Sequence, residues 1–122
     1  MNIEHVTANG IDLAVISSGD AVITGARSAL ELAMSARYET GAERIVTGKR
    51  PVCEDFFILS TGLAGEILQK FANYHVKAAI YGDYSHCTSK PRRDFIYESN
   101  KGKDFFFVPA KEEAMRRLTE IP

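Results

Sequence analysis

The sequence predicts a single α/β domain over residues 1–122, with a mixed, mostly parallel sheet and the element order ββαβαβαβα. Short apolar runs with a period of two alternate with stretches whose apolar side chains recur every three or four positions, as in strands alternating with helices. An Asn-Gly dipeptide between the first two runs indicates a hairpin. The chain has 122 residues, 45% of them hydrophobic, which is enough for one buried core.

Residues 2–18 are predicted to form this hairpin. Asn9 and Gly10 make the tight turn, because both tolerate the positive φ that such turns require. In the second strand, neighbouring side chains such as Leu13 and Ala14 point to opposite faces of the sheet. The hairpin therefore supplies the antiparallel part of the sheet.

The first helix is predicted from residue 26 onwards. Its inward face is expected to carry Ala26, Leu30, Ala33, Met34 and Arg37. We expect Thr24 to cap this helix and Gly41 to end it, because a hydroxyl accepts from a free amide and glycine adopts the left-handed conformation. A short strand centred on Ile45 and Val46 follows.

The next stretch, "KRPVCEDFFIL", covers residues 49–59 and lacks the periodic apolar pattern of the elements before it. It contains Pro51 and has no sustained period, so it predicts a long connection with one turn around residues 54–57. Long connections in small domains are usually functional or pack as lids.

A second helix is predicted in "FILSTGLAGEILQKF". Its apolar stripe consists of Leu63, Ile67, Phe71 and Ala72. The stretch "VKAAIYGD" then predicts a strand with Val76, Ala78 and Ile80 on one face.

The C-terminal part predicts a third helix, a last strand and a last helix. The third helix carries Phe95 and Ile96 and ends at Gly102, and "DFFFV" is the strand. In the last helix Ala114, Leu118 and Ile121 are expected to face inward, with the pairs Glu112/Arg116 and Glu113/Arg117 outside.

The charge balance excludes several function classes. Fifteen basic and sixteen acidic side chains nearly cancel, so we expect no binding to nucleic acid or to a membrane surface. The longest apolar runs are far shorter than the ~20 residues that span a bilayer, and the first residues do not resemble a signal peptide. A cytoplasmic protein is therefore expected.

The cysteine and histidine positions predict neither a disulfide framework nor a metal site. Cys53 and Cys87 are isolated, and His5, His75 and His86 are far apart in the chain. No glycine-rich nucleotide fingerprint is present, so no cofactor is predicted.

Two stretches offer candidate binding residues. The first is Ser60, Thr61 and Gly62, at the start of the second helix. Unpaired amides and the helix dipole favour an anion there, and glycine would let it approach closely. The alternative is that the hydroxyls only cap the helix.

The second stretch is "GDYSHCTSKPRR", which leaves the carboxyl end of a strand, where ligands of α/β sheets gather. Its candidates are Asp83, Ser85, His86, Ser89, Arg92 and Arg93. In the alternative interpretation Asp83 organises a turn, Ser89 caps the third helix, Cys87 is a small buried side chain and the arginines are solvated.

The motif "FILSTGLAG" resembles the start of the second helix in anti-sigma-factor antagonists, the STAS-like family. In that register Thr61 occupies the position that the family phosphorylates, and Leu59 stands where the family carries an aspartate. The longer stretches "TGLAGEILQKFANYHVKAAIYGDYS" and "SKPRRDFIYESNKG" resemble a bacterial family of small domains of unknown function related to that fold. The resemblance implies a STAS-like βα superhelix.

The same resemblance implies a non-enzymatic regulatory or binding module. It would bind a protein partner, such as a kinase or an anti-sigma-like regulator, or an anionic small ligand at the start of the second helix, under the control of phosphorylation. The alternative prediction is a small enzyme that uses Asp83, His86 and Cys87 on an anionic substrate, although adjacent side chains of an extended chain point apart.

Self-association is a further expectation. If helices cover only one face of the sheet, Phe105 or Phe107 and the loop residues Phe56 and Phe57 would leave an exposed apolar patch.

Overall fold

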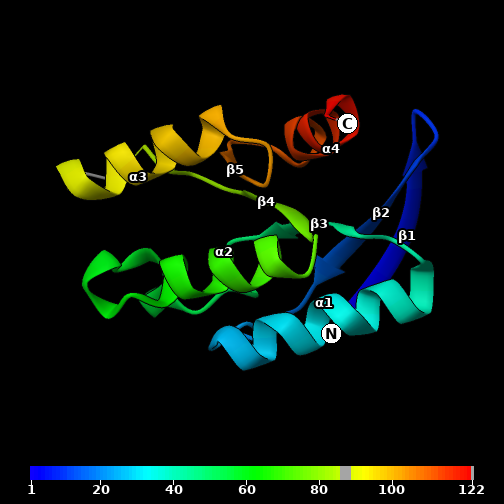
Figure 1. The fold of residues 1–122 in the computed structure, drawn as a ribbon, viewed down its shortest axis with the longest axis horizontal. Helices are drawn as coiled ribbons and strands as arrows, with labels where there is room; N and C mark the ends of the chain where they lie inside the picture. Colours follow the sequence, from blue (N-terminus) through cyan, green and yellow to red (C-terminus); the bar gives the residue numbers. More distant parts are fainter. Residues whose placement is uncertain (86–88, 122) are drawn as a thin grey trace.

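The computed structural model describes residues 1–85 and 89–121, and the order of its elements is the predicted one (Figure 1). The strands are β1 (Asn2–Ala8), β2 (Ile11–Ser17), β3 (Arg44–Gly48), β4 (Lys77–Tyr81) and β5 (Phe105–Val108). The α-helices are α1 (Ala26–Thr40), α2 (Leu63–Asn73), α3 (Lys90–Lys101) and α4 (Lys111–Glu120). The 3-10 helices η1 (Glu54–Phe57) and η2 (Leu59–Thr61) lie between β3 and α2.

The five strands form one mixed sheet in the order β1-β2-β3-β4-β5. β1 pairs with β2 in antiparallel fashion through the predicted turn, where Asn9 and Gly10 have φ of 51° and 76°. The other neighbouring pairs are parallel. The carboxyl ends of β2, β3, β4 and β5 therefore meet at one edge, which we call the carboxyl edge.

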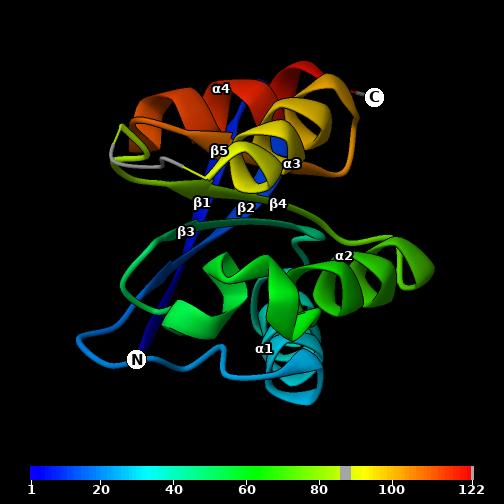
Figure 2. The same ribbon diagram turned by 90° about the vertical axis from the view of Figure 1, so that its left-hand side faces the viewer.

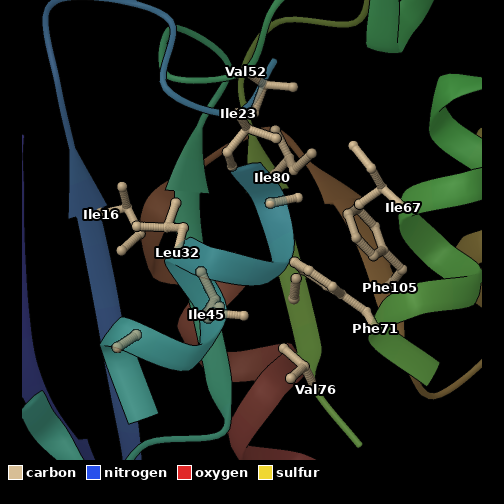
Figure 3. Close-up of a cluster of buried hydrophobic side chains, with 14 of the residues drawn as sticks. Ile16, Ile23, Leu32, Ile45, Val52, Ile67, Phe71, Val76, Ile80 and Phe105 are labelled. Carbon is tan, nitrogen blue, oxygen red and sulfur yellow. The ribbon is translucent and has the colours of Figure 1, made fainter. Parts of the chain in front are cut away.

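Helices cover both faces of the sheet. In Figure 2 the strands run between α4 on one side and α1 with α2 on the other, while α3 lies alongside β5. Figure 3 shows the core under α1 and α2, where side chains such as Ile45, Ile67 and Phe71 meet. On the opposite face Phe106 and Leu118 are fully buried.

The two-sided cover corrects the expectation of an exposed aromatic patch. Phe56, Phe105 and Phe107 are buried, because α1, α2 and α3 pack over the face to which they point. The ring of Phe95 from α3 meets Phe107 edge to face, with 5.7 Å between centroids. The phenylalanines of β5 are thus core residues.

Two expectations for α1 are wrong in detail. The N-cap is Gly25 rather than Thr24, since the Ser28 hydroxyl turns back and accepts from the amides of both residues. The buried positions are Ala26, Ala29, Leu32, Ala33 and Ala36, so Leu30, Met34 and Arg37 lie beside the buried stripe. Small alanines allow this face of the helix to lie close to its neighbours. Gly41 ends the helix in the left-handed conformation, as predicted.

In α2 and α4 the predicted faces are largely confirmed. Ala64, Ile67 and Phe71 are buried in α2, but Ala72 is exposed. In α4 the predicted ion pairs are wrong. Arg116 pairs with Glu113 and Glu120, while Arg117 turns inward, donates to the Asn100 carbonyl and stacks on Phe106.

None of the described helices is long and apolar enough to cross a bilayer.

Candidate binding site at the carboxyl edge

The long connection after β3 is held against the segment that follows β2. The amides of Val22 and Ile23 donate to the Pro51 carbonyl over 2.8 and 2.9 Å, and the Cys53 amide donates to the Ile23 carbonyl over 3.0 Å. These hydrogen bonds fix residues 49–53 beside the carboxyl edge. Residues of the connection also line a cavity at this edge.

A cavity of about 530 Å³ lies between this connection and α3, and we call it the basic cavity. Its lining consists of Lys49, Arg50, Val52, Glu54, Phe57, Ile58 and Arg92. The described lining thus combines three cationic side chains and one carboxylate with three apolar side chains. The chain as a whole has a net charge of −1, so this positive charge is a local feature.

Lys49 is fixed in the lining of the basic cavity. Its ammonium group donates to the Asp83 carbonyl over 3.0 Å and lies 5.2 Å from the ring centroid of Phe57 and 4.9 Å from that of Tyr84. Cation–π contacts of this kind contribute about 0.5–2 kcal/mol each. Gly82 makes the arrangement possible, because a Cβ atom there would lie only 2.4 Å from the Lys49 Cδ atom.

Tyr84 lies next to Lys49 and is neutral. Its hydroxyl donates to the Ile80 carbonyl over 2.8 Å. Burial raises the pKa of Tyr84 above its ordinary value, and the nearby charge of Arg92 opposes this shift only in part. The ring therefore contributes its π face to Lys49 without adding negative charge.

Arg92 enters the basic cavity from the first turn of α3. Ser89 caps this helix by accepting from the Arg92 amide over 3.4 Å, as the structural alternative predicted. The guanidinium carbon lies 5.6 Å from the ring centroid of Phe57. The Arg92 Nε atom is buried and has no hydrogen-bond partner within residues 1–85 and 89–121. An unpaired buried donor costs about 1–3 kcal/mol.

A second hollow of about 550 Å³ adjoins the basic cavity and lies over the ends of β2, β3 and β4. We call it the serine cavity, because Ser17 and Ser18 line it together with Gly82 and Asp83. Lys49 and Arg50 line both cavities. The Arg50 Nε atom donates to the Gly19 carbonyl over 2.9 Å, which holds this side chain at the boundary.

The predicted site at the start of α2 has the geometry of a local cap. The Thr61 hydroxyl lies 2.8 Å from the carbonyls of both Asp55 and Ile58, and it accepts from the Leu63 amide over 3.2 Å. Gly62 has a φ of 75° and begins the helix as its N-cap. Ser60, Thr61 and Gly62 are exposed, and the lining of the two cavities does not include them.

The residues predicted after β4 are divided between several positions. Asp83 lines the serine cavity and accepts from the Ser85 amide and hydroxyl over 2.8 and 2.5 Å, which is the predicted turn. Arg92 lines the basic cavity, and Arg93 is exposed. His86 and Cys87 lie outside the described residues, so the catalytic alternative stays a prediction. In the part of the chain that the structure describes, no three His, Cys, Asp or Glu side chains could hold a metal ion together.

The sequence reasoning missed most of the cavity lining. Lys49, Arg50, Phe57 and Ile58 all belong to the connection after β3. Ser17 is the last residue of β2, and Ser18 follows it. The available signal was the adjacent pair Lys49-Arg50 directly after a parallel strand, at the edge where α/β ligands bind.

These features define a small α/β domain with a ligand-sized basic cavity at the carboxyl edge of its sheet. Residues 8–118 match the model of the family described as "Domain of unknown function (DUF4180)", and the chain belongs to this family. The comparison with curated proteins and the comparison with solved structures found no match. The predicted membership of a family of unknown function is therefore confirmed, and the relation to anti-sigma-factor antagonists stays a prediction.

Proposed function

We propose that the protein is a non-enzymatic binding module that takes an anionic small ligand in the basic cavity. The observation that carries this proposal is that Lys49, Arg50 and Arg92 line about 530 Å³ of space, where Glu54 is the one acidic side chain among the described lining residues. Cations that are fixed before binding lose little entropy when an anion arrives, and charge-assisted hydrogen bonds are the strong ones.

The position of the cavity supports the same proposal. It lies at the carboxyl edge of parallel strands, where ligands of open α/β sheets bind. Arg92 lines the cavity, and its guanidinium group keeps its positive charge at every physiological pH, which favours an anionic ligand.

The resemblance to anti-sigma-factor antagonists supports a regulatory use of this binding in the cytoplasm, with a protein partner that senses the occupied site. Phosphorylation of Thr61 is not part of the proposal, because its hydroxyl is engaged with main-chain carbonyls and would have to leave them. The alternative, a small enzyme that uses Asp83, His86 and Cys87, stays a prediction, because His86 and Cys87 lie outside the described residues.

The test uses the matched pair Arg92→Gln and Arg93→Gln. Both changes remove one positive charge from the first turn of α3, but only Arg92 lines the basic cavity. We expect titration with inorganic phosphate, followed by NMR of backbone amides, to show saturable shifts around residues 49–58 and 92. Arg92→Gln should weaken this binding about tenfold, the loss of one charge-assisted hydrogen bond, and Arg93→Gln should leave it within about twofold.

Equal effects of the two variants would contradict a site in the basic cavity, since they would show that only the net charge matters. Absence of saturable shifts in the unaltered protein would contradict the proposal as a whole. Circular dichroism checks that both variants keep the fold.

A further inference from the structure

The two outer strands of the sheet differ in how their free sides are covered. At β5 the side chain of Asn100 from α3 takes the place of a neighbouring strand. Its amide group donates to the Phe107 carbonyl over 3.0 Å and accepts from the Phe107 amide over 2.7 Å. β1 forms the opposite edge, where its neighbour in the sheet is β2 (Figure 1). Proteins usually cover or interrupt such an edge, because its unpaired main-chain groups can pair with another strand.

The hairpin turn determines which main-chain groups of β1 are unpaired. A two-residue turn places its flanking residues, Ala8 and Ile11, in a hydrogen-bonded pair. Hydrogen-bonded and non-hydrogen-bonded pairs alternate along antiparallel strands. Ile3, His5 and Thr7 therefore direct their amides and carbonyls away from β2. Within residues 1–85 and 89–121 these groups have no hydrogen-bond partner.

The side chains of β1 leave this edge open. The His5 imidazole lies 2.9 Å from the Asp12 carboxylate, and the Thr7 hydroxyl donates to the same oxygen over 3.0 Å, so both side chains turn back over β2. β1 pairs one to one with β2 at each of its 7 positions and contains no bulge, proline or lysine. These are the features that commonly block pairing at an edge.

We infer that a second copy of this chain pairs with β1 in antiparallel fashion about a two-fold axis, so that two sheets join into one. His5 then lies opposite His5 of the second copy, and Ile3 lies opposite Thr7. In this register every outward amide and carbonyl of the three residues finds a partner. The edge is thus complementary to itself, as a two-fold interface requires.

The side chains of β1 favour this register over its neighbours. A shift by two residues in one direction would place Glu4 directly opposite Glu4 of the second copy, and like charges in opposed positions are destabilising. A shift in the other direction would place Ile3 opposite Asn9, which belongs to the turn. In the inferred register Glu4 lies opposite Val6, and the partner strand covers more of the half-buried Ile3 and Val6 side chains.

The test compares His5→Pro with His5→Ala. Proline at position 5 removes an outward amide, which an edge strand tolerates, and it leaves the hydrogen bonds to β2 in place. Sedimentation velocity with a reductant, at about 1 μM to about 1 mM protein, measures the dissociation constant of the dimer. We expect His5→Pro to weaken the dimer about thirtyfold, the loss of the two hydrogen bonds at the axis, and His5→Ala to leave it within about threefold.

Amide hydrogen exchange locates the interface in the unaltered protein. The amides of Ile3, His5 and Thr7 should exchange quickly in dilute solution and about tenfold more slowly at concentrations that populate the dimer. The amides of Glu4 and Val6 bond to β2 and should be protected at both concentrations. This measurement decides the question even if His5→Pro does not fold.

Three results would overturn the inference. The first is a monomer over the whole concentration range, which would leave the edge to a strand of a different protein. The second is a dimer in which the amides of Ile3, His5 and Thr7 exchange equally fast at all concentrations. The third is equal weakening by His5→Ala and His5→Pro, which would assign the contact to the imidazole. The proposed anion site would stand in each case, because its lining contains no residue of β1.

Discussion

The hydroxyl of Thr61 joins the connection after β3 to the first turn of α2. It can donate to the carbonyl of Ile58 or of Asp55, and it accepts from the Leu63 amide. Ile58 also lines the basic cavity, so the hydrogen bond from this hydroxyl to the Ile58 carbonyl stabilises one lining residue of the proposed site. At the scale of the residue, the Thr61 hydroxyl links the backbone of the connection after β3 to the first turn of α2 by hydrogen bonds.

Replacing Thr61 with valine keeps the shape of the side chain and removes these hydrogen bonds. We expect Thr61→Val to lower the free energy of unfolding by about 1 kcal/mol, since each such bond has a modest net value. Urea denaturation measures the change. Thr61→Ser keeps the hydroxyl and is the matched control. A valine variant as stable as the serine variant would contradict a stabilising effect of these hydrogen bonds.

At the scale of the element, α2 has one glycine at its N-cap and one within the helix, and alanine should have opposite effects on stability at these two positions. Gly62 begins the helix with φ of 75°, a conformation that side chains rarely adopt, and Gly65 lies within the helix. A Cβ atom would meet open space at both positions. Only the backbone conformation therefore distinguishes them.

We expect Gly62→Ala to lower the free energy of unfolding by about 1 kcal/mol, because alanine in the left-handed region is strained. Gly65→Ala should raise it by about 0.5–1 kcal/mol, because alanine favours the helix more than glycine does. Thermal or urea unfolding of the two variants tests the pair. Changes of the same sign would show that the helix begins elsewhere.

Periodicity predicted the strands and α-helices of the described residues, because burial of one or two faces of an element makes apolar side chains recur at a characteristic spacing. It did not predict the N-cap of α1, which is Gly25, with the Ser28 hydroxyl accepting from the amides of Thr24 and Gly25. The basic cavity was largely missed for a different reason. Its walls come from separate parts of the chain, and only the folded sheet brings Arg92 beside Lys49 and Arg50.

At the scale of the whole molecule, the sheet divides the core into two clusters. The cluster under α1 and α2 is the larger one, and among the described helices α4 supplies the buried residues that pack on the opposite face around Phe106. Leu118 from α4 is fully buried there. The smaller cluster therefore depends on few side chains, while the proposed binding site draws its walls from other elements.

Leu118→Ala should lower the free energy of unfolding by about 3 kcal/mol, the usual cost of a large cavity in a closed core. Tyr38→Ala is the control, since Tyr38 is 92% exposed and its removal should change stability by less than about 0.5 kcal/mol. Chemical denaturation measures both. A loss below about 1 kcal/mol for Leu118→Ala would show that α4 contributes little to the fold.

Gly82 allows the aliphatic stem of Lys49 to lie across the exit of β4. A single methyl group on that backbone atom would push the stem aside and move the ammonium away from the rings of Phe57 and Tyr84. The electrostatic potential at the carboxyl edge would then change although no charged residue had been gained or lost. The position of positive charge at the carboxyl edge thus depends on Gly82, which has neither a charge nor a side chain.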